Sequence, residues 1–453
     1  MKFIQTLKNI WGIKELRTRI LYTLGLLFIY RVGCFTVLPG VDPNLLKHAA
    51  DNRKATDLLG LINTFTGGAF DNAAVFALGV MPYITASIIV QLLGFAVPYF
   101  NRLQNKEGES GRKKLNQMQR LLTVAITLVQ GGGYLTLIRS QGAVDPSIPV
   151  GVFWFCNLII LTAGTMFCMW LGEKITDRGL GNGVSLIIMA GIIARLPSGF
   201  IFELTSAFTT GRLFLFVIMM VVWFLVVMAT ILLVQAVRNI PLHYAKQAVG
   251  KTAGATYVPS AGANRPLPIK VNSAGVMPII FAQAIMFLPV TALQYFNGEQ
   301  TKGFSRLNAM NDFTSVMYNV VFFILVVVFT YVYTALMINP NNQAEFLKRS
   351  NAFIPGVKPG QPTADFIDAV TTKITLPGAI MLGIVAILPA FAATVGINAQ
   401  WAQFFGGTTL LIMVGVILDT LRVVETYLVQ RKYEGLIEGG RIQGRNTSMQ
   451  QSI

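Results

Sequence analysis

The sequence has little charge for its length. Charged residues make up 12% of its 453 residues, whereas hydrophobic residues make up 53%. An average soluble domain carries about 25% charged residues, so this chain has about half the expected charge. Its apolar residues exceed what a water-soluble core of this size can bury, and most of the chain is therefore expected to lie in lipid.

The sequence is also poor in cysteine and histidine. Cys34, Cys156 and Cys168 all lie in apolar runs, so no disulfide framework is expected. His48 and His243 are the two histidines, and no Cys/His cluster with metal-ligand spacing surrounds them. Neither a bound metal nor a cofactor is expected.

Catalytic and nucleotide-binding motifs are missing from the sequence. There is no Gly-rich phosphate loop followed by Lys and Ser/Thr, no metalloprotease helix motif and no Gly-x-Ser-x-Gly. The Gly-rich stretch 179–183 lies between two apolar runs and indicates a tight turn. An intramembrane enzyme is therefore not expected.

Apolar runs of about 20 residues are long enough to cross a bilayer as helices. No low-complexity tract separates them, so the sequence predicts one all-α integral membrane domain. The predicted spans are 20–38, 74–97, 121–138, 152–171, 184–201, 213–234, 274–296, 315–338, 376–396 and 404–424.

Charge along the chain predicts its orientation. Lys and Arg number 36 against 20 Asp and Glu, a net charge of +16. If the N-terminus is cytoplasmic, 27 of the 36 basic residues fall in cytoplasmic segments, as the positive-inside rule requires. Both termini are then cytoplasmic, and the basic excess indicates membrane orientation rather than DNA binding. The fifth span is the weak point, because residues 184–194 give only eleven residues before Arg195 and Pro197.

Three segments outside the spans carry further predictions. Residues 1–19 lack the features of a signal peptide and favour an amphipathic helix on the membrane surface. The loops 236–272 and 339–375 are about 37 residues each, a length that is usually functional or disordered. Residues 236–272 are basic without an acid, which either follows the orientation rule or provides a docking site for an acidic cytoplasmic partner.

The apolar segment 58–70 is too short to span. At about 1.5 Å per residue it reaches only about 20 Å, and Gly67-Gly68 separates it from the next helix. Non-helical backbone at membrane depth needs surrounding protein or a water-filled cavity. Two interpretations stay open from these residues: a re-entrant packing segment and a movable stopper in a cavity.

The second span contains polar side chains that favour contact with another helix or water. Thr85, Ser87 and Gln91 need hydrogen-bond partners in lipid. Isoleucine pairs at helical spacing, such as 84 with 88 and 188 with 192, more often indicate lipid contact or core than a special site. Mid-span carboxylates and histidines are absent, since Arg31 and Asp419 lie toward span ends. This absence tells against an ion-coupled secondary transporter, the main rival class.

Four ordered motifs resemble the SecY family, the central subunit of the protein-conducting channel. The resemblance extends along essentially the whole chain. The motifs are FALGVMPYITASIIVQLL at 76–93, WLGEKITDRGLGNG at 170–183, LPIKVNSAGVMP at 267–278 and FIPGVKPG at 353–360.

This resemblance implies two pseudo-symmetric five-helix halves around an hourglass pore with a short re-entrant plug helix. The first half is expected at 20–201, the second at 202–424 and a cytoplasmic tail at 425–453. By resemblance, the pore ring is Ile84, Ile88, Ile188, Ile192, Ile280 and Ile412. The plug, at 58–70, includes Leu58, Leu61, Ile62, Phe65, Gly67 and Gly68. Thr85, Ser87, Gln91 and Gln283 suit a lateral gate between the second/third and seventh/eighth helices.

The resemblance also implies a passive channel in the bacterial cytoplasmic membrane. It would translocate unfolded secretory proteins with signal sequences and release transmembrane segments into lipid. Implied partners are the small subunits SecE and SecG, the SecA motor ATPase and the ribosome. Candidate docking residues are Arg238, Lys246, Lys251, Arg265, Lys348, Arg349 and Lys358. Lys358 and Asn239 replace residues that are commonly arginine in the family, which bears on partner contact rather than on fold.

Overall fold

The computed structural model describes residues 11–42, 45–46, 58–105, 108–244, 266–296 and 312–439. This part of the chain is almost entirely helical, with four short strands. The predicted class, an all-α membrane protein, is confirmed by the helix content and by the length and hydropathy of the helices.

Each predicted span corresponds to one long helix. These helices are α2 (Lys14–Gly33), α5 (Met81–Ala96), α7 (Gly108–Ser140), α8 (Val150–Arg178), α9 (Gly183–Thr209), α10 (Leu213–Gln235), α11 (Met277–Phe296), α13 (Val316–Met337), α15 (Gln361–Thr394) and α17 (Gly407–Gly439). Four shorter helices are α4 (Leu58–Phe65), α6 (Pro98–Asn105), α14 (Pro340–Arg349) and α16 (Ala399–Ala402).

Seven helices of the described part are long and apolar enough to cross a membrane. Two further apolar stretches, Met81–Gly94 and Met277–Met286, are shorter. Helix α2 is charged at both ends, with Lys14 and Arg17 near its start and Arg31 near its end. Residues 74–80, predicted as helix, form turns instead, and α5 begins with Pro82 in its first turn. Proline suits that position because it has no N–H to satisfy.

Several predicted boundaries were wrong. Helix α9 continues through Arg195 and Pro197 to Thr209, so the fifth span is complete and the boundary predicted at 201/202 falls inside it. The break between α9 and α10 is at 210–212. Helix α2 begins at Lys14, so residues 14–19 are continuous with the helix of the first predicted span, and residues 11–12 are helical on the other side of Ile13. Residues 1–10 of that predicted helix lie outside the described residues.

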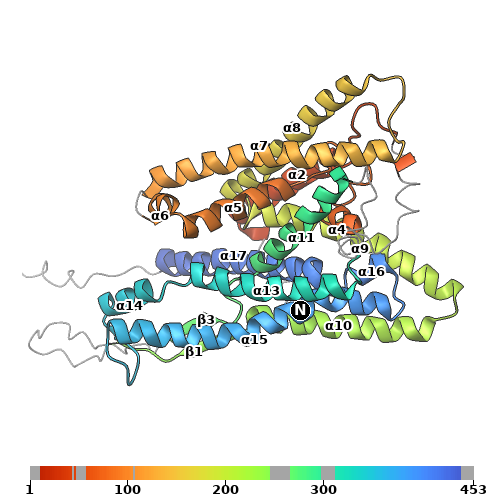
Figure 1. Ribbon diagram of the computed structural model, residues 1–453. Coiled ribbons are helices and arrows are strands. Elements are labelled where there is room, and N and C mark those ends of the chain that lie inside the picture. Colours follow the sequence, from red (N-terminus) through yellow and green to blue (C-terminus); the bar gives the residue numbers. More distant parts are fainter. Residues whose placement is uncertain are drawn as a thin grey trace, which may run out of the picture.

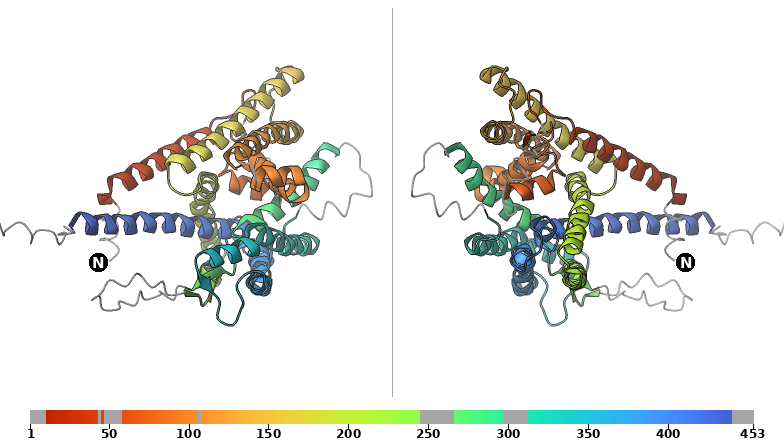
Figure 2. Two further views of the ribbon diagram at one scale, coloured as in Figure 1. Left: turned by 90° about the vertical axis from the view of Figure 1, so that its left-hand side faces the viewer. Right: turned by 90° about the vertical axis from the view of Figure 1, so that its right-hand side faces the viewer.

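The long helices form two groups that lie side by side (Figure 1). Helices α2, α5, α7 and α8 lie in one group, and α10, α13, α15 and α17 lie in the other. The rotated views keep the red-to-yellow N-terminal helices apart from the blue C-terminal ones (Figure 2). Helices α9 and α11 join the groups, because α9 packs on α8 and α17 while α11 packs on α7 and α13.

The two long loops fold together at one end of the bundle. Strand β1 (Val237–Ile240) pairs antiparallel with β3 (Leu267–Lys270), and β2 (His243–Tyr244) pairs with β4 (Ala352–Phe353). The second pairing joins the first loop to the second loop. Their shared core contains Ile240, Leu242, Ile269, Leu347, Ala352, Ile354 and Ile367. Most of the second loop is helical, because α14 and the first 15 residues of α15 occupy it. We call these strands with α14 the loop module.

Candidate pore and plug

Two cavities open at the end of the bundle that carries the loop module, and together they form a funnel. One, of about 510 Å³, lies between α5, α7, α8, α9 and α11. The other, of about 240 Å³, is lined mainly by α9, α11, α13 and α17. Both are lined by Asn182, Ser185, Ile188, Met277 and Ile280, so they meet along α9 and α11. The funnel therefore lies on the seam between the two helix groups.

Four of the six predicted ring residues line this funnel. Ile84, Ile188 and Ile280 line the larger cavity, and Ile412 lines the smaller one with two of them. Ile88 and Ile192 line neither cavity and are almost fully buried. Five of the six belong to one large buried cluster, and Ile280 packs against it. The funnel thus brings together isoleucines of α5, α9, α11 and α17, and we call the six predicted residues the isoleucine cluster.

The plug segment, residues 58–71, packs against the other side of the isoleucine cluster. Helix α4 covers only 58–65, and turns follow to residue 80, so the predicted helix at 58–70 is shorter than expected. Phe65 and Thr66 share a small cavity of about 10 Å³ with Ile187 and Ile188. Ile188 therefore lines the funnel on one side and this small cavity beside the plug segment on the other.

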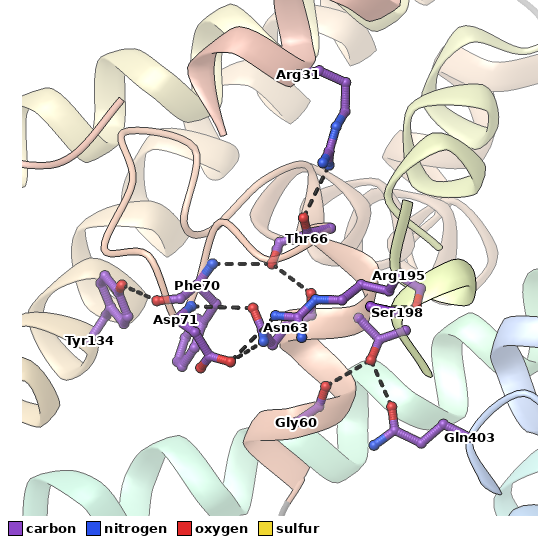
Figure 3. Close-up of polar contacts among 12 residues, drawn as sticks. Arg31, Gly60, Asn63, Thr66, Phe70, Asp71, Tyr134, Arg195, Ser198 and Gln403 are labelled. Carbon is purple, nitrogen blue, oxygen red and sulfur yellow. Dashed lines mark hydrogen bonds and ion pairs between the residues drawn. The ribbon is translucent and has the colours of Figure 1, made fainter. Parts of the chain in front are cut away.

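Helix α2 holds the backbone of the plug segment from one side. The Arg31 guanidinium donates to the carbonyl oxygen of Gly67 at 3.0 Å (Figure 3). The Tyr30 hydroxyl and the Cys34 thiol both donate to the carbonyl oxygen of Thr66, at 3.5 and 3.7 Å. These carbonyls lie just after the end of α4, where helical hydrogen bonding stops. Helix α2 therefore stabilises the turn that ends the plug helix.

An ion pair and a tyrosine fix the far end of the plug segment. Asp71 lies 3.4 Å from the Arg195 guanidinium of α9, and both side chains are partly exposed. Asn63 donates to the same carboxylate and accepts from the Asp71 backbone N–H, which closes the turn on itself. The Tyr134 hydroxyl of α7 donates to the Phe70 carbonyl oxygen at 2.6 Å (Figure 3). All these groups belong to the N-terminal helix group or to α9.

Among the residues that the structure describes, one side-chain hydrogen bond joins the plug helix to the C-terminal helix group. The Thr64 hydroxyl donates to Gln403 Oε1 at 2.6 Å, across 339 residues of sequence, and Gln403 is 4% exposed. The loop carrying Gln403 is held by the Trp223 indole N–H, which donates to the Phe404 carbonyl oxygen at 2.9 Å. Thr409 of α17 donates to the Gln403 carbonyl oxygen. The plug segment thus contacts both helix groups, with unequal numbers of bonds.

Glycine allows the plug segment to lie directly on α9. A Cβ atom at Gly191 would lie 2.4 Å from the Phe65 carbonyl oxygen, closer than atoms approach without displacement. Gly67 has a φ of +64°, and a Cβ there would lie 2.9 Å from the Gly191 Cα. Gly191 lies between Ile188 and Ile192 in the sequence, so the backbone contact is beside the isoleucine cluster.

The predicted gate residues do not bond from helix to helix in this conformation. Thr85 donates to the Met81 carbonyl oxygen, and Gln91 donates to the Ser87 hydroxyl, so both bonds stay within α5. Ser87 and Gln91 line the larger funnel cavity. Gln283 of α11 is 7% exposed, and its Oε1 has no hydrogen-bond partner among the described residues. The bonds of Thr85 and Gln91 within α5 satisfy part of their requirement, and the position of Ser87 and Gln91 on the funnel wall agrees with the expected contact with another helix or water.

Four candidate docking residues lie on the loop module or beside it. Arg238 of β1, Lys348, Arg349 and Lys358 are exposed. Arg349 pairs with Glu345 one turn away at 2.6 Å, which leaves it less free for a partner. The Lys358 carbonyl oxygen accepts from Thr363 and so fixes the turn before α15. Lys246, Lys251 and Arg265 lie outside the described residues.

Sequence reasoning missed most of the polar contacts of the plug segment. Arg31 and Arg195 were noticed as charges inside spans, and an ionisable residue in a span is by default a candidate functional residue. That signal could have identified both. Tyr134 and Gln403 have no comparable local signal, because their partners lie 64 and 339 residues away in sequence.

Comparisons with known proteins agree with this arrangement. The SecY family model matches residues 74–421. A protein translocase subunit SecY from Streptomyces scabiei is 38% identical over 436 residues, covering 93% of this chain and 97% of the relative. One from Halalkalibacterium halodurans is 39% identical over 443 residues, covering 96% of this chain and all of the relative.

Solved structures match the fold over 94% of this chain and 94% of each structure. One, described as a protein-conducting channel, has a TM-score of 0.64 at 17% identity. A second comes from a study in which the SecY plug domain stabilises the closed state of the translocation channel and maintains a membrane seal, with a TM-score of 0.62 at 17% identity. A third is Sec61 in a canine ribosome–channel complex, with a TM-score of 0.61 at 16% identity.

Proposed function

The chain belongs to the SecY family of protein translocase subunits, and we propose that it forms a passive, gated, protein-conducting channel. Unfolded secretory chains cross through the funnel and the isoleucine cluster, and transmembrane segments leave sideways into lipid. The observation that carries this proposal is the position of Ile188, which lines the funnel and also the small cavity beside the plug segment. At this point the side chain of Ile188 separates the funnel from the plug segment.

Aliphatic side chains suit a constriction that must seal and then deform. They offer no hydrogen bonds to water or ions, so a narrow aliphatic opening stays dry and does not conduct. The isoleucine cluster draws on four helices, so separating the helix groups widens it without breaking any hydrogen bond among its members. A passing chain of any side-chain composition can then be surrounded.

The plug segment closes the resting channel in this proposal. Its polar contacts, unlike the aliphatic ones, are either made or broken, which favours two discrete positions. Most bonds hold it to α2, α7 and α9, and Thr64–Gln403 is the side-chain link to the other group. Separation of the groups breaks that link first.

Cross-linking the plug helix to the C-terminal group tests this function. A variant carrying Thr64→Cys and Gln403→Cys, with the three native cysteines replaced by serine, is bridged by a short bismaleimide. We expect the bridged channel to lose transport of an unfolded secretory chain, while each single-cysteine variant treated in the same way retains it. Full transport by the bridged channel contradicts gating at this contact.

Partners supply the energy in this proposal, since the family motifs include no nucleotide site. A cytoplasmic motor of the SecA type and the ribosome are the proposed partners, with SecE- and SecG-type small subunits beside the helices. The ribosome is supported by the fold shared with Sec61 of a ribosome–channel complex. We place the protein in the bacterial cytoplasmic membrane, with both termini and the loop module in the cytoplasm, because that orientation satisfies the positive-inside rule.

A further inference from the structure

A second, smaller cavity lies in the C-terminal helix group, apart from the funnel. It has a volume of about 30 Å³ and lies between α11, α13, α15 and the start of α17. Amide and hydroxyl side chains gather on its wall: Gln283, Asn319, Gln403, Thr408 and Thr409. The rest of the wall is largely apolar, and polar groups on the wall of a cavity favour bound water over an empty space.

The two glutamines on this wall come from functionally different elements. Gln283 belongs to α11, which packs against α5 and α7 across the seam between the helix groups. Gln403 is the residue that accepts the hydrogen bond of Thr64 in the plug helix. The cavity therefore lies between the helix at the seam and the plug's partner in the C-terminal group.

Gln283 lines this cavity, and one atom of its amide has an unmet hydrogen-bonding requirement. Its side chain is 93% buried, being 7% exposed, and Oε1 has no partner among the described residues. A buried carbonyl oxygen without a partner is unfavourable, and ordered water is the usual remedy where space and other polar groups allow it. A water molecule needs about 10–15 Å³ of such volume and two to four polar partners. The cavity meets both requirements.

We propose that this cavity binds one or two water molecules that connect Gln283 of α11 to Gln403, and through Gln403 to the plug helix. The proposal deepens the proposed function, because it makes the plug sensitive to the position of α11. When α11 moves, the water bridge is lost and Gln403 is no longer held in place to accept from Thr64. The plug is then released by the same movement that opens the seam.

Cys34 provides a built-in reporter of plug position. Its thiol is 1% exposed and donates to the Thr66 carbonyl oxygen, so the plug segment covers it. In a background with Cys156→Ser and Cys168→Ser, the rate of Cys34 alkylation by a membrane-impermeant maleimide measures how often the plug leaves. The reagent is added from the side of the membrane that the plug faces.

Substitution of either glutamine by methionine removes the amide while keeping nearly the same volume and an unbranched side chain. We expect Gln283→Met and Gln403→Met each to raise the Cys34 labelling rate by about threefold to tenfold, the effect of losing one hydrogen bond. If the two residues act through one bridge, the double variant labels no faster than the faster single variant. Gln343→Met is the matched control, because Gln343 lies on α14 of the loop module and its Oε1 is likewise buried without a partner among the described residues. It should label at the original rate.

Two results would overturn the proposal. One is labelling of a folded, membrane-inserted Gln283→Met channel at the original rate, and the other is single effects that multiply in the double variant. A third test is an experimental density map that resolves buried water elsewhere in the protein. Such a map should show water between Gln283 and Gln403, and a dry cavity there also overturns the proposal. Transport is measured in parallel: if labelling responds as expected but no secretory chain crosses, the proposed function fails while the bridge stands.

Discussion

The isoleucine cluster and the plug segment lie in contact, yet they are built from opposite chemistry. The cluster consists of side chains without hydrogen-bonding groups, contributed by four helices of both groups. The plug segment is held by guanidinium, hydroxyl, thiol and amide groups at defined distances, mostly from the N-terminal group and α9. Aliphatic contacts weaken gradually as atoms separate, whereas a hydrogen bond is lost within a fraction of an ångström.

This difference assigns different tasks to two neighbouring seals. The aliphatic constriction can stay in contact with a translocating chain while its diameter changes. The plug segment has two positions, bound and released, and its bonds set the balance between them. Changes in the plug contacts should therefore alter how often the resting channel opens, and changes in the cluster should alter how well it closes around a chain.

Loss of the plug helix should have the largest effect on the resting seal. Replacing residues 58–65 by Gly and Ser in equal number keeps Ala69 and Phe70, which are buried in the core. We expect ion conductance of resting channels in vesicles to rise at least about tenfold, because the segment loses the buried side chains of Ile62 and Phe65 and the hydrogen bond from Thr64 to Gln403. Secretory chains should still cross. A replaced channel that fails to insert or fold would instead favour the packing interpretation of this segment.

A polar substitution in the cluster should have the next largest effect. Ile412 is 3% exposed. In Ile412→Asn the amide can bind water that isoleucine cannot, so the closed constriction wets more readily. We expect a several-fold rise in resting conductance and easier passage of chains with weak signal sequences. Ile412→Val is the matched control, since it stays aliphatic and costs only about 0.5–1.5 kcal/mol of stability. Equal conductance in the Asn and Val variants would exclude Ile412 from the pore.

Loss of the ion pair at the end of the plug segment should have a smaller effect on resting conductance. Asp71 and Arg195 are partly exposed, so the pair is worth at most about 1 kcal/mol, or roughly a fivefold change in the open fraction. Arg195→Gln should raise resting conductance within that limit. High salt should narrow the difference between the variant and the original protein, because it screens the pair. A difference that grows with salt would show that charge attraction is not the cause.

A change in the loop module should leave both seals intact. Lys358 is exposed beside it, and the loop module lies at one end of the bundle, away from α4 (Figure 1). Lys358→Glu should weaken motor-dependent export by repelling an acidic partner surface, whereas Lys358→Arg should keep or strengthen it, since arginine holds a carboxylate through two hydrogen bonds. Motor ATPase stimulation, export and ribosome-coupled insertion are measured together with resting conductance. If Lys358→Glu leaves all the partner-dependent activities unchanged, the loop only follows the orientation rule.

Much of the fold could be predicted because bilayer thickness imposes a length on apolar runs. Hydropathy located all the long helices, and it erred where backbone at membrane depth is not helical, as at residues 74–80. Pro82 could have placed the start of this helix correctly, since proline favours the first turn of a helix. The paired strands of the loop module escaped notice because two-residue and four-residue strands carry too little pattern.

The candidate site was harder to predict from the sequence than the fold. Ile188 and Ile192 have a helical spacing that is common among buried isoleucines. Only the family resemblance therefore identified them as candidate pore residues. Contacts such as Thr64–Gln403 depend on how two helix groups dock, which no local pattern encodes. Gly191 illustrates the same limit: its close approach to Phe65 is a property of packing between α4 and α9.

Site-specific photocrosslinking of a stalled secretory chain tests most directly that chains pass through the isoleucine cluster. A photoreactive residue is placed at Ile88 or Ile280, and at Ile89 as the control, because Ile89 is adjacent to Ile88 on α5 but is 36% exposed on the outside of the bundle. We expect the stalled chain to crosslink strongly at positions 88 and 280 and weakly at 89. Crosslinking at 89 equal to that at 88, or none at 88 and 280, would contradict a pore at this constriction.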